Sequence, residues 1–171
     1  RERRLRDDLK GKSLAMLFAK TSTRTRVSFE VAMTQLGGHA INLKWDETNF
    51  VKGDIEDESR VMSRYCDAIM ARLYVHEHMK RIARASDKPV INGLDDDHHP
   101  CQALADLMTI MEAKGRLEGL KVGWIGDSTN VFTSLSQAAD LAGMETVIAA
   151  PEGYEPKIKT KALVVHNPRE A

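Results

Sequence analysis

The sequence is poor in the features that mark several classes of protein. Its 171 residues contain only two cysteines, Cys66 and Cys101, which lie far apart and match no metal-ligand spacing. This cysteine content excludes a disulfide-stapled scaffold and indicates two buried free thiols in a reducing compartment. No apolar run is long enough to span a bilayer, and no signal-peptide pattern is present. We therefore expect a cytoplasmic protein that has no membrane partner.

An excess of charge of either sign is also missing. Lysine and arginine together number 25, as do aspartate and glutamate, so the formal net charge is zero. Without net charge the chain does not present the general basic surface that nucleic acids attract, and we expect no nucleic-acid partner. Hydrophobic residues make up 42% and charged residues 29% of the chain, which is typical of a globular protein with one large domain or two small ones.

What the sequence does contain is an alternation of short apolar runs with helical patterns. Each run has the length of a buried strand, and each helical pattern repeats apolar residues at intervals of three and four. The predicted strands cover residues 14–18, 39–43, 68–73, 89–92, 121–125 and 146–150. This alternation predicts an α/β fold with a doubly wound, Rossmann-like parallel sheet, whose ligands bind at the carboxyl ends of the strands.

The helical patterns also predict which side chains share a face. In the helix predicted over residues 54–65, one face carries Val61, Met62 and Tyr65. A second helix is predicted to begin at Pro100, which suits the first helical position because its missing N–H costs nothing there. The apolar face of that helix is formed by Leu104, Leu107, Met108 and Met111.

A polar block, Lys20 to Thr25, lies where the first predicted strand ends and a helix begins. Backbone N–H groups at a helix start have no partner within the helix and carry the positive end of the dipole. The hydroxyls of Ser22, Thr23 and Thr25 and the guanidinium of Arg24 add donors, and together these groups suit a phosphate or a similar dianion. The block is not a Walker P-loop, because the G-x-x-x-x-G-K spacing is absent. An N-cap followed by surface arginines explains the same residues about equally well.

A second motif, His-Pro-Cys-Gln, covers residues 99–102. His99 would be the N-cap of the helix that begins at Pro100, and Gln102 would lie in its first turn. The helix dipole favours a neutral imidazole there, which can donate a hydrogen bond to a carbonyl oxygen. The alternative is a capping histidine with a structural glutamine. The adjacent run from Asp95 to His99 also suggests a metal site, but neighbouring loop residues rarely chelate one ion together, and we expect no metal.

The string Ser-Thr-Arg-Thr-Arg followed by Ser-Phe-Glu resembles the carbamoyl-phosphate loop of the aspartate and ornithine carbamoyltransferases. The later His-Pro-Cys-Gln motif and the segments 68–72 and 89–94, in this order and separation, are similar to the same family along most of the chain. Lys20 before the loop and Leu94 after the fourth strand resemble the ornithine branch rather than the aspartate branch.

The resemblance implies two domains and a set of roles. Residues 1–117 would form the carbamoyl-phosphate domain, and residues 118–171 an incomplete second α/β domain that binds the amino acid. The family assigns the phosphate to Ser22, Thr23, Arg24 and Thr25. It assigns the carbonyl oxygen to Arg72, His99 and Thr25, with Gln102 near the carbamoyl nitrogen, so Arg72, His99 and Thr25 are the expected catalytic residues.

The Gly-Asp segment at residues 126–127 is similar to the family's Gly-Asp-x-Asn-Asn-Val, in which the second Asn is associated with substrate. Asn130 keeps that position, whereas Thr129 replaces the first Asn. Asn130 as an ordinary N-cap is the alternative.

The reaction implied is carbamoyl transfer from carbamoyl phosphate to L-ornithine, giving L-citrulline and phosphate, without a cofactor and in a homotrimer or a multiple of trimers. Two alternatives stay open. One is a carbamoyltransferase for aspartate or another amine, and the other is a non-catalytic homologue that binds anions.

The sequence also departs from the family pattern. An Asp before a Ser-Met-Gly segment and a His-Cys-Leu-Pro loop, which family members carry further along, do not occur in it. Residues 157–166 are too few to hold the helix and the next strand that the family has there. We therefore expect a truncated or incompletely ordered chain. The loop from Thr48 to Asp54 departs as well, so the resemblance does not extend to the contact that this loop makes with a neighbouring subunit in relatives.

Overall fold

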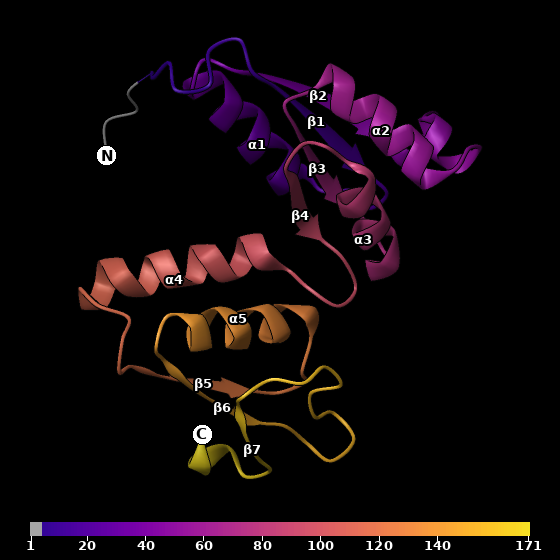
Figure 1. Ribbon diagram of the computed structural model, residues 1–171. Coiled ribbons are helices and arrows are strands. Elements are labelled where there is room, and N and C mark those ends of the chain that lie inside the picture. Colours follow the sequence, from indigo (N-terminus) through magenta and orange to yellow (C-terminus); the bar gives the residue numbers. More distant parts are fainter. Residues whose placement is uncertain (1–4) are drawn as a thin grey trace. The chain divides into compact units, whose positions relative to one another are not determined.

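The computed structural model describes residues 5–171. The chain divides into two compact units, Arg1–Asp95 and Asp96–Ala171, and each is described by itself. Every strand in the described part of the chain belongs to one of two parallel sheets, one in each unit (Figure 1). The predicted α/β fold is thereby confirmed, whereas the assignment of carbamoyl-phosphate binding to residues 1–117 stays a prediction.

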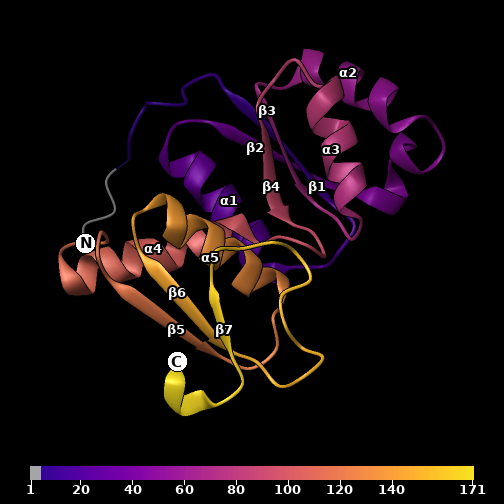
Figure 2. The ribbon, with the colours of Figure 1, turned by 60° about the horizontal axis from the view of Figure 1, so that its bottom comes forward.

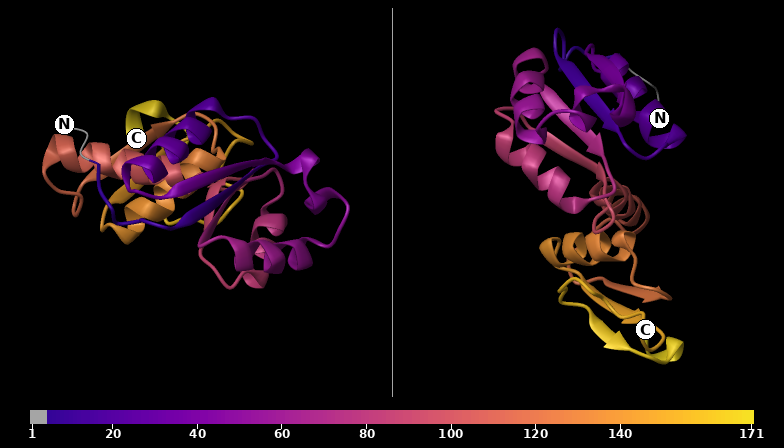
Figure 3. Two further views of the ribbon diagram at one scale, coloured as in Figure 1. Left: turned by 90° about the horizontal axis from the view of Figure 1, so that it is seen from above. Right: turned by 90° about the vertical axis from the view of Figure 1, so that its right-hand side faces the viewer.

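The first unit is a sheet with helices on both faces. Its strands are β1 (Ser13–Phe18), β2 (His39–Lys44), β3 (Ala68–Arg72) and β4 (Val90–Leu94), in the order β2-β1-β3-β4. Its helices are α1 (Thr23–Gln35), α2 (Ile55–Tyr65) and α3 (His76–Ala85). Helix α1 covers one face, and α2 and α3 cover the other (Figures 1 and 3). The direction of winding reverses between β1 and β3, and in sheets of this kind ligands bind beyond the carboxyl ends of the strands at such a point.

The apolar run that predicted β1 supplies both halves of the core. Leu14, Met16 and Phe18 pack with Met33 of α1 on one face of the sheet. The alternate residues, including Leu17, join the cluster that α2 and α3 form on the other face. A strand of a parallel sheet is buried on both faces, so its sequence is a continuous apolar run rather than an alternation.

Of the three apolar side chains predicted to share a face of α2, Met62 packs against the core. Val61, however, is 48% exposed and Tyr65 is 78% exposed. The buried face instead carries Ile55, Ser59 and Ser63. The hydroxyl of Ser59 donates to the carbonyl of Ile55 at 2.6 Å, and small side chains satisfied by their own helix let it approach the sheet closely.

The segment after β2 forms two short 3-10 helices, Trp45–Glu47 and Asn49–Val51, and buries Phe50. Of the two predicted buried thiols, Cys66 is buried, whereas Cys101 of the second unit is only half-buried.

An ion-pair cluster joins α2 to α3. Arg81 Nε donates to Glu56 Oε1 at 2.6 Å, and Arg81 Nη2 lies 2.8 Å from Asp54 Oδ2. The hydrogen bond from Arg81, followed by the one with Asp54, lowers the pKa of Glu56 from 4.5 to about 2. A carboxyl whose pKa is lowered by folding stabilises the fold above its ordinary pKa and loses that effect as the pH falls through the folded value.

Glu56→Gln is therefore expected to lower the melting temperature at neutral pH and to make progressively less difference as the pH falls from about 4.5 towards about 2. The effect is expected to be modest and to shrink in high salt, because the cluster is partly exposed to solvent. Melting curves of both proteins over the pH range in which they stay folded measure it. A difference in melting temperature that is the same at every pH would contradict this account of the ion pair.

The second unit has a three-stranded parallel sheet in the order β5-β6-β7. Its elements are α4 (Pro100–Lys114), β5 (Lys121–Ile125), α5 (Asn130–Leu141), β6 (Glu145–Ala149), β7 (Leu163–Val165) and a 3-10 helix, Pro168–Glu170. The three strands lie side by side, and α5 lies between the sheet and α4 (Figures 2 and 3). Phe132 of α5 and Ile148 of β6 are fully buried against each other and are partly covered by Trp124.

One prediction for this unit differs from the structure. The apolar face predicted for α4 is largely exposed, with Leu104 at 66% and Met108 at 55%, whereas Ala103 is buried. Residues 157–166 hold a strand, β7, which pairs parallel to β6, and no helix precedes it there, as expected for a segment too short to hold both. Among the described residues, no helix has both the length and the apolar character needed to cross a membrane.

Candidate active site

The polar block lies at the start of α1, as its sequence predicts. Ser22 is the N-cap, with extended backbone angles of −159° and 103°, and its hydroxyl accepts a hydrogen bond from Thr25 N at 3.3 Å. The same hydroxyl donates to Thr25 Oγ1 at 2.9 Å. Thr23, Arg24 and Thr25 are the first three helical residues, so their side chains surround the amino end of α1, where backbone donors and the dipole favour an anion.

Arg72 reaches this loop from the end of β3. Its Nη1 atom lies 3.4 Å from Thr25 Oγ1, at the long end of the hydrogen-bond range. The backbone fixes the two segments to each other, because Arg72 O accepts from Ala19 N at 2.9 Å. Lys20 lies over the ring of Tyr74, with its Nζ 4.4 Å from the ring centroid, which adds a cation–π contact between the same segments. The first unit thus brings Ser22, Thr25 and Arg72 together.

A cavity of about 650 Å³ adjoins the loop on the side of β2. Loop residues Ser22 and Thr23 line it together with Arg26 of α1 and Lys44 of β2. Arg24, Thr25 and Arg72 do not line it. Because the expected donors to the carbonyl oxygen lie outside this lining, we do not place carbamoyl phosphate in this cavity.

His99, Gln102 and Asn130 belong to the second unit. His99 precedes α4 in the N-cap position, and its N–H donates to Ser134 Oγ of α5 at 2.8 Å. Within the described part of the chain its side chain makes no capping hydrogen bond, so the alternative of a capping histidine gains no support. Gln102 Nε2 donates to Asp106 Oδ1 at 2.9 Å on the exposed side of α4.

Asn130 is the first residue of α5, and Thr129 is the N-cap. The alternative that Asn130 is an ordinary N-cap is therefore wrong, because Thr129 occupies that position. Whether the second-unit residues His99, Gln102 and Asn130 act with those of the first unit stays a prediction.

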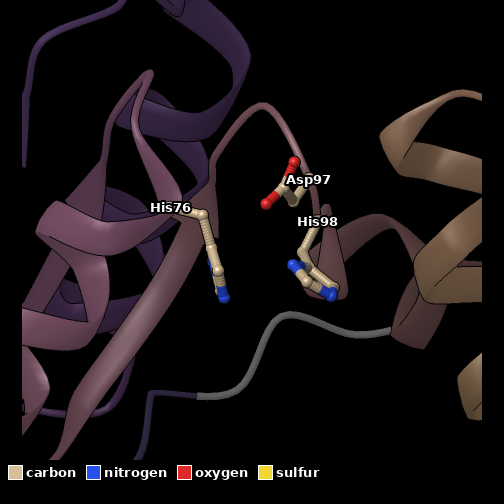
Figure 4. A group of neighbouring side chains, drawn as sticks. All are labelled: His76, Asp97 and His98. Carbon is tan, nitrogen blue, oxygen red and sulfur yellow. The ribbon is translucent and has the colours of Figure 1, made fainter. Parts of the chain in front are cut away.

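The run from Asp95 to His99 is divided between the units, with Asp95 in the first and the remainder in the second. Figure 4 shows His76 at the start of α3, and Asp97 and His98 in the segment that leads to α4. His76 belongs to the first unit and Asp97 and His98 belong to the second, and we assign no metal site to them.

One group of side chains in the first unit was missed by the sequence reasoning. Asp95 is completely buried, and its Oδ2 lies 2.7 Å from His76 Nδ1 and 2.7 Å from Asn92 Nδ2. The available signal was an acidic residue placed directly after a buried strand, but the run of three aspartates suggested a metal site instead.

Comparison with known proteins identifies the family. A family model described as "Aspartate/ornithine carbamoyltransferase, carbamoyl-P binding domain" matches residues 1–112. The chain belongs to this family. It is 55% identical over 150 residues to the ornithine carbamoyltransferase of Anoxybacillus flavithermus, covering 87% of this chain and 48% of the relative. It is 52% identical to that of Pyrococcus horikoshii over 164 residues, or 95% of this chain and 52% of the relative.

Solved structures of carbamoyltransferases support the same family assignment. The ornithine carbamoyltransferase of Thermus thermophilus superimposes with a TM-score of 0.91 at 44% identity, over 99% of this chain and 61% of that one. The catalytic subunit of the aspartate transcarbamoylase of M. jannaschii gives a TM-score of 0.76 at 37% identity, over 90% of this chain and 53% of that one. The chain thus spans about half the length of the curated relatives it matches. The predicted resemblance to the carbamoyltransferase family is confirmed.

Proposed function

We propose that the protein transfers the carbamoyl group from carbamoyl phosphate to L-ornithine, giving L-citrulline and phosphate. The observation that carries the proposal is the junction of β1 and α1, where the amino end of a helix, the Ser22 and Thr25 hydroxyls and the Arg72 guanidinium come together. Family membership and the names of the relatives at 55% and 52% identity support the choice of reaction and of ornithine.

In this reaction the side-chain amine of ornithine attacks the carbonyl carbon of carbamoyl phosphate. A C–N bond forms, the C–O bond to phosphate breaks, and the amine loses a proton while phosphate leaves with the electron pair. No protein nucleophile is needed. The protein has to hold a dianion and to stabilise the negative charge that develops on the carbonyl oxygen, and donors fixed in advance do this best.

The proposed roles follow from these needs. Ser22, Thr23, Arg24 and Thr25 hold the phosphate at the amino end of α1. Arg72 and Thr25 donate to the carbonyl oxygen from the first unit, and His99 adds a donor from the second. In the second unit Gln102 would contact the carbamoyl nitrogen and Asn130 the amino acid.

The two alternative functions, a carbamoyltransferase for another amine and a non-catalytic homologue, require different properties of the protein. A carbamoyltransferase for aspartate would use the same loop and Arg72, and the similarity to the M. jannaschii enzyme gives this alternative some support. A non-catalytic homologue would bind the anion without transfer. Both leave the carbamoyl-phosphate half of the proposal unchanged, because that half depends on the first unit.

In its complete reading frame the protein is expected to bind carbamoyl phosphate in calorimetry and to form citrulline when ornithine is added, whereas the 171 residues alone are expected to bind carbamoyl phosphate weakly and to form no citrulline above background. Aspartate supplied in place of ornithine is the matched comparison. Formation of carbamoyl-aspartate in place of citrulline would overturn the choice of amine. Binding without transfer to either amine would favour the non-catalytic homologue, and the absence of any anion binding would remove the assignment of the loop.

We also propose that the protein acts in the cytoplasm as a homotrimer or a multiple of trimers, with carbamoyl phosphate and L-ornithine as its small-molecule partners and without a cofactor. The resemblance to the family supports this. Light scattering of the purified protein would measure the assembly directly.

A further inference from the structure

The buried carboxylate of Asp95 is held by donors from two different elements. His76 begins α3 and Asn92 lies in β4, and both approach the same oxygen, Asp95 Oδ2, at 2.7 Å. Asn92 Nδ2 donates to this oxygen, and His76 Nδ1 lies within hydrogen-bond distance of it. Burying a charge is costly unless hydrogen bonds compensate it, and this carboxylate is completely removed from solvent. The arrangement therefore ties the start of α3 to the end of β4.

The end of β4 has an irregular backbone. The register between β3 and β4 shifts at Arg72, which pairs with Leu94, whereas Ala71 pairs with Asn92. Gly93 is thus the extra residue of a bulge. A Cβ atom at Gly93 would lie 2.6 Å from Met70 Sδ and 3.1 Å from Ala71 O, so no side chain fits there without movement.

Asn92 holds this bulge with both ends of its side chain. While its amide nitrogen donates to Asp95, its Oδ1 atom accepts a hydrogen bond from Leu94 N at 2.9 Å. Leu94 has a φ of 158°, which makes it the single non-glycine residue with positive φ in the described part of the chain. Because this conformation is disfavoured for a residue with a Cβ atom, it requires support from its surroundings.

The bulge lies directly against Arg72. The carbonyl of Gly93 lies 3.5 Å from Arg72 Nη1, the atom that also lies 3.4 Å from Thr25 Oγ1. The next backbone contact, Leu73 N to Leu94 O at 2.9 Å, fixes the same two strands. The guanidinium is therefore placed between the phosphate loop and a carbonyl whose position depends on the bulge.

We propose that Asp95 and His76 are positioning residues for Arg72. By fixing the bulge at Gly93 they hold the guanidinium where it can donate to the carbonyl oxygen of carbamoyl phosphate. This inference rests on the proposed function, because it concerns the donor to that oxygen. It adds two residues that touch neither substrate and whose effect on the ligand passes through Arg72.

The test compares two ligands that differ in the carbonyl group. Inorganic phosphate presents only the dianion, whereas carbamoyl phosphate also presents the oxygen that Arg72 contacts. Calorimetry on the full chain is expected to show that His76→Ala weakens carbamoyl phosphate roughly tenfold while changing phosphate affinity little, since a misplaced donor loses only its own contact. His39→Ala, an exposed histidine of β2, is the control and is expected to change neither affinity.

A double-mutant cycle shows whether the effect passes through Arg72. In an Arg72→Ala background, His76→Ala is expected to cause no further loss of carbamoyl-phosphate affinity, because the group that it positions is gone. Asp95→Ala is expected to behave as His76→Ala does. If Asp95→Ala fails to fold, His76→Ala alone provides the test, because the His76 side chain is 29% exposed.

The outcomes separate the two proposals. A wild-type protein that binds neither ligand would overturn the proposed function and this inference with it. If the wild-type protein prefers carbamoyl phosphate to phosphate and His76→Ala keeps the full preference, the inference is overturned and the function stands. An equal loss for both ligands, or a loss that persists undiminished without Arg72, would also overturn it.

Discussion

Replacing Arg24 with lysine is expected to remove most of the affinity for carbamoyl phosphate, although the charge is kept. A guanidinium presents its donors in a rigid planar fork that matches two phosphate oxygens, whereas an ammonium acts as a point charge. Losing one charge-assisted hydrogen bond of this kind weakens binding by roughly 10- to 100-fold. Calorimetry with carbamoyl phosphate and with inorganic phosphate measures the loss, and both ligands are expected to suffer, since Arg24 is assigned to the phosphate.

Arg26→Lys is the matched control. Arg26 lies two residues further along α1 and pairs with Glu30, its Nε 2.9 Å from Oε1, in an exposed ion pair. A lysine can make that contact as well, so the substitution is expected to leave affinity unchanged within about twofold. Equal affinities in Arg24→Lys and wild-type protein would remove Arg24 from the phosphate site. An equal loss in both variants would show that the effect is not specific to the guanidinium fork of Arg24, because both substitutions keep the charge.

Replacing His99 with alanine is expected to reduce turnover far more than it reduces affinity for carbamoyl phosphate. The carbonyl oxygen gains negative charge as the amine attacks, so a donor to it contributes most in the transition state. Removal of one such donor typically lowers turnover by about 10²- to 10³-fold. Initial rates of citrulline formation, measured beside carbamoyl-phosphate affinity by calorimetry, separate the two effects.

Two variants sharpen this test. His99→Gln keeps a neutral donor and is expected to recover part of the lost turnover, whereas His98→Ala changes the neighbouring histidine and is expected to lower turnover much less. Full turnover in His99→Ala would show that His99 has no role in the reaction and only precedes α4. A loss of affinity as large as the loss of turnover would place its contact in the ground state instead.

The sequence predicted most of what depends on local pattern. The apolar run of β1 predicted a strand buried on both faces, and Ser22 predicted the start of α1. The switch point between β1 and β3 then explains why Thr25 and Arg72, separated by 47 positions, meet at one edge of the sheet. The order of the strands was not predicted, although the alternation of strands and helices restricts it strongly.

What failed depended on partners that no local pattern specifies. The apolar stripe of α4 was visible, but periodicity does not say which residues cover a stripe, and Met108 is exposed. In α2 the buried face carries Ser59 and Ser63, because close packing against the sheet selected for small size rather than hydrophobicity. Asp95 was misjudged because its partner His76 lies 19 positions away in another element.

Two of the hydroxyls at the amino end of α1, those of Ser22 and Thr25, already have partners within the protein. Ser22 Oγ bonds to Thr25 Oγ1, which in turn lies within reach of Arg72. A dianion that enters the loop therefore exchanges existing hydrogen bonds for new ones, and the heat released on binding is expected to be small for the number of contacts formed. The favourable free energy then comes mainly from charge neutralisation and from water released by both partners, so it is expected to be largely entropic and to weaken steeply as salt is added.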